Sequence, residues 1–372
     1  MGYNKNLNAI SIYSKSIKQL MHKLLLLLFI IFTVNGFSQS ANIDTNYLNA
    51  YDTLKNMLSN KNSASLKYAV FTTENVFLEN KLIYSNFNEH ISKLATLVSY
   101  EIQFNPLKGY RYSDSSNVQK NYALFKFFKD TLKVLSSSEG NFVHLPYTYD
   151  FNDFFGEQNW SNMFVTKLLV SHSGNCHSLP YLYKILADEL GATCWLSLAP
   201  NHMYIKNRCK GIGWYNTELT SGDFPIDAWI MASGYLPLQA IQNGIYMDTL
   251  SNQQCIALCV LDLAKEYEHQ THNYFDSFII KCCDLSLQYF PKNVQAKLLR
   301  AETLKQVFLK EQRDQFPKPT ITFNDMQDMY ANLYDLGYRE MPDKMYMKWL
   351  QSVVKERNKY NNPKLTATLQ KK

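Results

Sequence analysis

The 372-residue sequence lacks the marks of several protein classes. It has no CxxC pair and no HExxH motif, the patterns that usually announce zinc sites. After the N-terminal region, no apolar run is long enough to span a bilayer. Apolar residues make up 46% and charged residues 19% of the chain, which excludes a wholly disordered protein. We therefore expect a globular protein of two or three domains, with no metal and no other cofactor.

The N-terminal residues have the pattern of a secretory signal. An apolar run over residues 24–34 follows Lys23, and Gly36-Phe37-Ser38 supplies small residues spaced for signal peptidase. The run is too short for a bilayer span and matches the hydrophobic region of a signal peptide. An uncleaved anchor or a buried core helix is the alternative. We expect a cleaved signal peptide at 1–38 and an exported protein, periplasmic or secreted, without a membrane span after cleavage.

The charge balance argues against a nucleic-acid partner. The full chain has a formal net charge of +6. Loss of residues 1–38 would remove four of the 38 basic side chains and none of the 32 acidic ones, which leaves a charge of +2. A basic surface of the kind that binds nucleic acid is therefore not expected.

Hydrophobic periodicity divides the rest of the chain into four parts. Residues 39–150 are predicted to be an all-helical region, in which Asn86-Phe87-Asn88-Glu89 has the spacing of a capping box. Residues 151–240 combine helices with three strand-like runs, and residues 241–318 return to helical periodicity. Residues 319–372 are predicted as C-terminal helices with a frayed basic tail. The predicted fold class is α+β, with a small antiparallel sheet flanked by helical regions.

The third part has the features of a helical repeat. Amphipathic runs at 256–268 and 275–290 are followed by Pro291-Lys292-Asn293 and a further helix. The pattern resembles a tetratricopeptide repeat, although the signature Trp and Gly of the first helix are absent. An ordinary helical hairpin is the alternative. If the chain is a binding protein, these helices are the expected surface for a protein partner.

The number of cysteines is odd. In an oxidising compartment an odd number leaves at least one thiol unpaired within the chain, and the pairing cannot be deduced from the spacing. The last four are predicted to be buried structural residues. The seven are Cys176, Cys194, Cys209, Cys255, Cys259, Cys282 and Cys283.

Cys176 is the strongest candidate for a nucleophile. It follows a turn at Ser173-Gly174-Asn175 and is predicted at or just inside the start of a helix that stops at Gly191. The free N–H groups and the positive dipole at a helix start favour a thiolate and lower the pKa of a cysteine. A buried inert cysteine is the alternative.

A predicted hairpin supplies a base for this thiol. Strand-like runs at 202–206 and 214–219 flank a turn near Lys210, and a hairpin centred there places His202 directly opposite Glu218. The carboxylate would orient the imidazole, which in turn would activate the thiol, as in nucleophilic triads. A surface histidine and a solvated carboxylate are the alternatives. His172 and His177 are weaker candidates for the base, and His177 is expected to point elsewhere.

These residues carry a family resemblance over about residues 155–235. Gly174-Asn175-Cys176 at a helix start, His202 at a strand start and Trp214-x-x-x-Glu218 resemble the transglutaminase-like core of the papain-like cysteine fold. The resemblance implies Cys176 as the nucleophile, His202 as the general base, and Glu218 in the position of the family's Asp, with one extra methylene.

The resemblance extends to a particular branch of that family. Pro200-Asn201-His202 and Thr220-Ser221-Gly222 resemble bacterial members in which such a core precedes tetratricopeptide-like helices. Many members of that branch have lost the triad, which favours a non-enzymatic alternative.

An oxyanion hole needs two donors. The backbone N–H of Cys176 is one, and an upstream side chain is expected as the other, although the papain-type Gln spacing is absent. Trp160, His172 and Asn175 are the candidates, and Asn175 is the working assignment.

The leading interpretation is an exported cysteine-dependent acyl-transfer enzyme, a peptidase, an amidase or a transglutaminase-like enzyme, acting through a thioester. Its expected substrates are peptides or proteins, including amides of the cell envelope, with water or an amine as the acceptor. The alternative is a catalytically inactive transglutaminase-like protein that binds partners or serves as a scaffold in the envelope.

Overall fold

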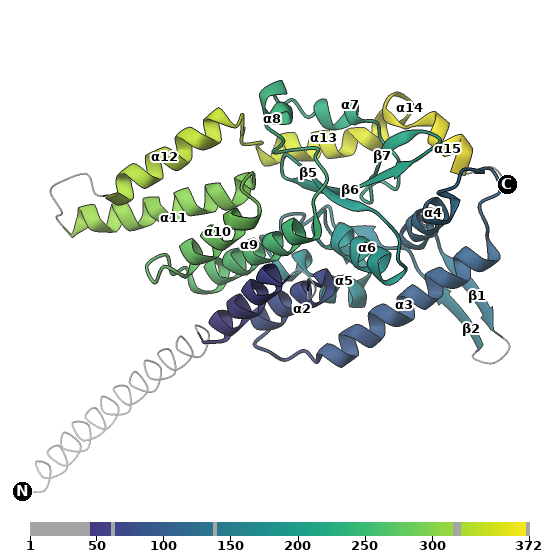
Figure 1. Cartoon of the computed structure of the whole chain (residues 1–372), viewed down its shortest axis with the longest axis horizontal. Helices are drawn as coiled ribbons and strands as arrows, with labels where there is room; N and C mark the ends of the chain where they lie inside the picture. Colours follow the sequence, from purple (N-terminus) through teal and green to yellow (C-terminus); the bar gives the residue numbers. More distant parts are fainter. Residues whose placement is uncertain (1–44, 61–63, 137–139, 315–320, 370–372) are drawn as a thin grey trace, which may run out of the picture. The chain divides into compact units, whose positions relative to one another are not determined.

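A computed structural model describes residues 45–60, 64–136, 140–314 and 321–369. The chain divides into two compact units, residues 1–49 and 50–372. In the first unit residues 45–49 are described, and they are helical. The predicted signal peptide at 1–38 lies outside the described residues. The second unit holds all the described strands (Figure 1).

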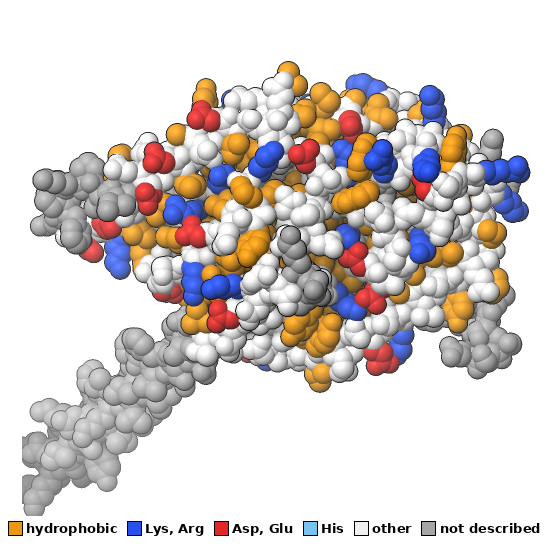
Figure 2. Space-filling view, viewed as in Figure 1, with side chains coloured by type: hydrophobic (Ala, Val, Ile, Leu, Met, Phe, Trp, Pro, Cys, Tyr) orange, Lys and Arg blue, Asp and Glu red, His pale blue; other side chains and the backbone are white. Residues whose placement is uncertain are grey.

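The fold is α+β, as predicted, and most of it is helical. The described strands form three small sheets of two, two and three strands. On the face shown in Figure 2, acidic and basic side chains are interspersed among uncharged ones. None of the described helices has the length and hydrophobicity needed to cross a membrane.

The N-terminal region is not all-helical, so this prediction was wrong. Its helices are followed by an antiparallel hairpin in which Leu132 pairs with His144. Leu132 is buried and Lys133 is exposed, and this alternation over a short run favours a strand over a helix. A further short strand, β3, follows. The elements are α2 (Leu66–Phe77), α3 (Tyr84–Phe104), α4 (Ser115–Lys129), β1 (Leu132–Ser136), β2 (Gly140–His144) and β3 (Thr148–Tyr149).

The predicted capping box does not form. Helix α3 begins at Tyr84, with Ile83 in the cap position and no side-chain cap, so Asn86 is already helical. The ring of Tyr84 packs edge-on against Tyr68 and Phe71, with centroids 4.8 and 5.1 Å apart. We attribute the early helix start to this packing, which outweighs a surface cap of about 1 kcal/mol.

The central region carries the predicted order of helices and strands. Gly191 ends α6 as predicted, because its φ of +60° is the left-handed conformation that glycine adopts most readily. Strand β4 pairs in parallel with β3. The elements are the 3-10 turn η2 (Trp160–Met163), α5 (Val165–Ser171), β4 (Ser173–Gly174), α6 (Ser178–Glu189), β5 (Trp195–Ala199), β6 (His202–Cys209) and β7 (Gly213–Thr217).

The three-stranded sheet is antiparallel in the order β5-β6-β7. Its hairpin register differs from the predicted one. Ile205 lies opposite Thr217, so one more step along the ladder sets Glu218 opposite Tyr204 and not opposite His202. Residues two apart on a strand share a face. The carboxylate therefore remains on the face of the imidazole, in a diagonal position.

Helices then pack one on the next along the chain, α9 on α10, α10 on α11 and α11 on α12 (Figure 1). Ser251 and Gln254 form a capping box at the start of α9, and the side chain of Asn293 caps α11. The elements are α7 (Asp227–Met231), α8 (Leu238–Gln242), α9 (Asn252–Thr271), α10 (Phe278–Tyr289), α11 (Val294–Arg313) and α12 (Ile321–Asp335).

The C-terminal segment returns to the sheet, where α13 lies beside it in Figure 1. The segment does not end in a frayed tail within the described residues, because α15 is helical and buries Leu365 and Leu369 against Tyr110 and Val118. The last elements are α13 (Asp343–Lys355), α14 (Arg357–Tyr360) and α15 (Pro363–Leu369).

Candidate active site

Cys176 lies in the turn that leads into α6, two residues before the helix begins at Ser178. The side-chain oxygen of Asn175 accepts hydrogen bonds from the backbone N–H groups of His177 (3.0 Å) and Ser178 (3.2 Å). Asn175 therefore holds this turn in the manner of a helix cap, and Cys176 is the residue that follows it. The thiol is buried, with 8% of the residue exposed. Among the described residues, no acceptor takes a hydrogen bond from the backbone N–H of Cys176.

His202 and Glu218 form a buried pair. Nε2 of His202 lies 2.7 Å from Oε2 of Glu218, and both residues are almost fully buried. The other carboxylate oxygen accepts the backbone N–H of Thr220 at 2.8 Å, which fixes its orientation. Because Nε2 is engaged, Nδ1 is the ring nitrogen left to exchange a proton. Two other polar residues that follow His202 in the chain, Asn216 and Asp227, bind each other at 2.8 Å.

Tyr346 of α13 joins the thiol to the imidazole. Its hydroxyl donates to Sγ of Cys176 at 3.2 Å and lies 3.2 Å from Nδ1 of His202 and from the hydroxyl of Tyr149. Sγ also lies 3.7 Å from the carbonyl oxygen of Asn201. Sequence reasoning missed Tyr346, because it is 170 residues from the cysteine and stands in no motif.

The electrostatics of the three groups favour charge separation. Burial alone lowers the pKa of His202, but the Glu218 carboxylate overrides it and raises that pKa to about 10. Burial raises the pKa of the Cys176 thiol. The hydrogen bond with His202 and the charge of His202 lower it by more, so the pKa of the thiol lies below its ordinary value. The pKa of Glu218 is lowered by His202 against the effect of burial. The arrangement is that of a thiolate beside an imidazolium held by a carboxylate.

The other cysteines contrast with Cys176. All seven are reduced and buried, and the last four are buried as predicted. Burial raises the pKa of Cys194 and of Cys255 to about 12, and it also raises the pKa of Cys259, Cys282 and Cys283. A thiol of raised pKa is a poor nucleophile, so reactivity is expected to concentrate at Cys176.

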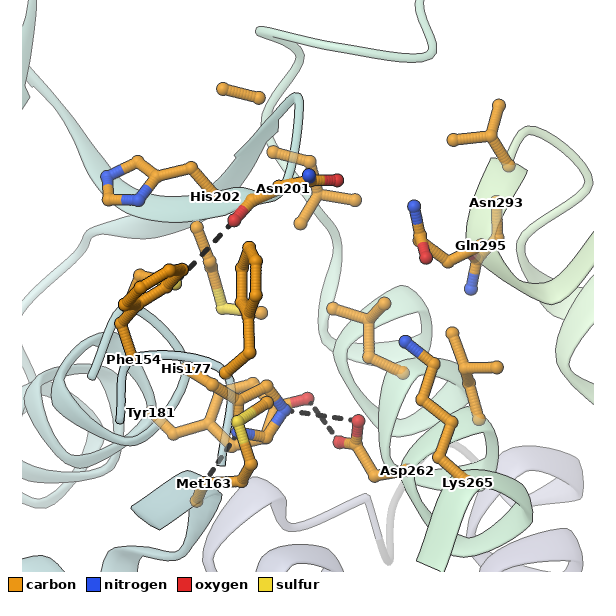
Figure 3. Close-up of a pocket in the computed structure, with 18 of the residues that line it drawn as sticks. Phe154, Met163, His177, Tyr181, Asn201, His202, Asp262, Lys265, Asn293 and Gln295 are labelled. Carbon is orange, nitrogen blue, oxygen red and sulfur yellow. Dashed lines mark hydrogen bonds and ion pairs between the residues drawn. The ribbon is translucent and has the colours of Figure 1, made fainter. Parts of the chain in front are cut away.

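A cavity of about 350 Å³ opens beside Cys176 and His202. Figure 3 shows His202 and Asn201 on one side of it and Asp262 and Lys265 of α9 on the other. Most of its wall is apolar. The apolar side chains include Phe154, Phe155, Met163, Tyr246, Leu258 and Leu261.

His177 lines this cavity, contrary to the expectation that it points elsewhere. Its Nε2 lies 3.1 Å from a carboxylate oxygen of Asp262, and Nδ1 lies 2.9 Å from the carbonyl oxygen of Met163. Tyr181 donates to the other oxygen of Asp262 at 2.8 Å. Burial lowers the pKa of His177, but Asp262 more than offsets it and the net shift is upward. The resulting positive charge further lowers the pKa of the Cys176 thiol.

The side chain of Asn175 is not free to serve an oxyanion. Its oxygen caps α6, and its Nδ2 donates to the carbonyl oxygen of Phe154 at 3.1 Å and to Sδ of Met163 at 2.8 Å. Among the alternatives, His172 binds the carbonyl oxygen of Leu145 and does not line the cavity. Trp160 does line it, but its ring stacks on His269 with centroids 4.6 Å apart, and its buried indole N–H has no hydrogen-bond partner among the described residues. None of the three candidates therefore presents a side-chain donor beside Cys176.

No group of His, Cys, Asp or Glu side chains in the described ranges is arranged to hold a metal ion. Comparison of the chain with models of known protein families, with curated proteins and with solved structures found no match.

Proposed function

We propose that the protein is an exported cysteine-dependent acyl-transfer enzyme with a transglutaminase-like core at residues 151–240. The observation that carries the proposal is the convergence of three residues from separate elements: Cys176 and His202 line one cavity, and the buried Glu218 holds His202 from behind. A lowered thiol pKa beside a raised imidazole pKa is the pairing that nucleophilic cysteine catalysis needs.

The proposed reaction begins with attack of the Cys176 thiolate on an amide carbonyl carbon. The tetrahedral intermediate collapses as the imidazolium of His202 gives its Nδ1 proton to the leaving amine, which breaks the C–N bond and leaves a thioester. His202 then takes a proton from water or from an acceptor amine, whose attack releases the thiol. Glu218 holds the ring and stabilises its charged form throughout.

The backbone N–H of Cys176 is the proposed donor to the oxyanion, because it donates to no acceptor among the described residues. An unpartnered buried donor costs about 1–3 kcal/mol, which is offset when a substrate oxygen accepts from it. We therefore place the reacting carbonyl beside the start of α6.

The substrate is proposed to be a peptide, a protein or another amide of the cell envelope. This follows from the signal-like residues 1–38, from which the mature protein is expected to begin near Gln39. N-terminal sequencing of exported material tests this, and a chain that starts at residue 1 would overturn it.

A second candidate function is that of a binding protein, which has the fold of such an enzyme but does not catalyse the reaction. The Tyr346 hydroxyl favours it, because it lies within hydrogen-bond distance of both Sγ and Nδ1 and the thiol is only 8% exposed. In that case the helices at 241–318, proposed to be tetratricopeptide-like, would carry the partner.

Thiol alkylation separates the two functions. The mature protein is treated with iodoacetamide at about pH 5.5, well below the ordinary thiol pKa of about 8.5, and the modified cysteine is identified by peptide mass mapping. Selective modification of Cys176 that parallels the loss of amide hydrolysis or transfer supports the enzyme. A Cys176 that reacts only after unfolding supports the binding protein.

A further inference from the structure

Lys265 places an unpaired positive charge in the cavity. It lies on α9 and lines the cavity wall opposite His202. Figure 3 shows its side chain extending from α9 towards Asn293 and Gln295, where α11 begins. Among the described residues no carboxylate forms an ion pair with Lys265, and no acceptor takes a hydrogen bond from it.

Three acidic residues lie within one turn of Lys265 on α9, and among the described residues none forms an ion pair with it: Asp262, Glu266 and Glu268. Both carboxylate oxygens of Asp262 are occupied, one by His177 and the other by Tyr181. Glu266 is buried, and burial raises its pKa well above its ordinary value. Asp262 is paired with His177, so Lys265 has no carboxylate partner at this end of the cavity among the described residues.

The start of α11 adds to the positive electrostatic potential near Lys265. Val294 and Gln295 line the cavity and are the first residues of this helix. The side chain of Asn293 caps the N–H of Ala296, and Asn293 itself lines the cavity, so the N-terminal end of α11 lies at the cavity wall. The positive pole of a 20-residue helix therefore reinforces the charge of Lys265.

Between this end and the thiol the wall is apolar. Its lining includes Phe154 and Phe155, and Leu258 and Leu261 of α9. A cavity of about 350 Å³ is at the lower end of the ligand pockets of about 300–1,000 Å³ found in proteins. It has room for a group the size of one or two amino acid residues.

We infer that this cavity is a specificity site for a substrate that carries a carboxylate, with an apolar segment between that carboxylate and the reacting carbonyl. Lys265 pairs with the carboxylate, and the phenyl and leucyl side chains enclose the segment. The inference rests on the proposed function for the reacting carbonyl, but binding at Lys265 does not require turnover. The carboxylate is that of an acidic side chain or of a chain terminus.

The test uses the mature chain with Cys176→Ala, so that binding is measured without reaction. Isothermal titration compares hydrocinnamate with hydrocinnamide, two ligands of nearly equal shape that differ in charge. We expect the carboxylate to bind at least about tenfold more tightly, equivalent to about 1.4 kcal/mol. Lys265→Met should abolish the preference and Lys265→Arg should retain it.

Lys93→Met is the matched control, since it removes the same charge from an exposed side chain on α3 and should leave the preference unchanged. Equal binding of the two ligands, or a preference that survives Lys265→Met, overturns the inference.

Two peptide pairs then identify the source of the carboxylate. The first compares acetyl-Phe-Ala with a free C-terminus against its C-terminal amide, and the second compares acetyl-Phe-Glu-amide with acetyl-Phe-Gln-amide. The pair that shows the Lys265-dependent preference names the source, and a preference in neither overturns the peptide substrate class. If Lys265 binds carboxylates while Cys176 stays unreactive, the inference stands and the enzymatic function fails.

Discussion

Glu218 reaches His202 from a diagonal position. The hairpin ladder sets Glu218 opposite Tyr204, and the imidazole that it binds at 2.7 Å lies two residues further along β6. Diagonal partners on a sheet are about 7–8 Å apart, compared with about 4.5–5.5 Å for residues directly opposite. A glutamate spans the longer gap, and an aspartate is one methylene shorter. A glutamate, where the resemblance to transglutaminase-like proteins implies an aspartate, is therefore matched by the register.

Glu218→Gln tests the charge of this pair. The amide keeps the length of the side chain but cannot stabilise the imidazolium, so the pKa of His202 should fall towards its ordinary range. We expect turnover to fall by about 10²–10⁴-fold, the contribution of a positioned acid–base group. Amide hydrolysis and the NMR titration of His202 measure the two effects.

Glu218→Asp tests whether the side chain at this position must be as long as glutamate to contact His202. We expect the shorter carboxylate to lose its contact with Nε2 and turnover to fall in a similar way, although the charge is kept. Glu157→Asp, on the loop between β3 and η2, is a matched control for the loss of one methylene. An Asp variant as active as the native protein would show that the diagonal distance does not select Glu.

Cys176→Ala should abolish acyl transfer and leave the fold intact, because the helix start is held by Asn175 and not by the thiol. Activity assays and thermal unfolding check both parts. Cys194→Ala is the control: this thiol is also buried, but its pKa is raised, and its loss should leave turnover unchanged. Residual turnover in Cys176→Ala would remove this residue from the proposed mechanism.

Much of the site could be predicted because its signals are local. Gly191 marks a helix end, and the run at 202–206 has strand character and forms part of β6. A shared face tolerates a register error of two residues. The same holds for Cys176, whose place follows from the turn before it. The structure does not support Asn175 as an oxyanion donor, because its side-chain amide is already hydrogen-bonded. The oxygen accepts from the N–H of Ser178, and the nitrogen donates to the carbonyl of Phe154.

The rest depends on contacts that no local pattern carries. Tyr346 reaches the thiol because α13 returns to the sheet after the helices from α9 to α12, and sequence spacing cannot reveal such a return. Leu365 and Leu369 belong to a segment that looked like a basic tail, and their burial requires the partners Tyr110 and Val118 from the other end of the chain.

Tyr346→Phe tests the hydroxyl between the thiol and the imidazole. A hydrogen bond from this hydroxyl favours the thiolate, so we expect the pKa of Cys176 to rise and alkylation below about pH 7 to slow severalfold. The pH profile of iodoacetamide labelling gives the shift. Tyr183→Phe, which removes a buried hydroxyl bonded to Asn121, is the control. An unchanged profile in Tyr346→Phe would mean that the hydroxyl does not stabilise the thiolate.

The last prediction concerns the pH dependence of stability. His202 binds its proton more tightly in the folded state, where its pKa rises from 6.5 to about 10. Its contribution is therefore fully present below pH 6.5 and is lost as the pH rises towards about 10. Cys176 has the opposite sign, because its folded pKa lies below 9.0. Between the folded thiol pKa and 9.0 its contribution grows with pH. Over the pH range in which both His202 and Cys176 titrate, the loss of stability from His202 and the gain from Cys176 cancel.

Cys176→Ala removes the contribution of the thiol to the pH dependence of stability and leaves that of His202. Its stability should fall as the pH rises from about 7 to about 8.5, by up to about 1.4 kcal/mol per pH unit for one proton, while the native protein shows no such slope from this pair. Urea unfolding of both proteins at each pH measures the difference, in which all other titrating groups cancel. Glu218→Gln in the Cys176→Ala background should flatten the slope again, since Glu218 raises the pKa of His202. Parallel pH profiles for the native and Cys176→Ala proteins would show that Cys176 and His202 do not form a thiolate–imidazolium pair.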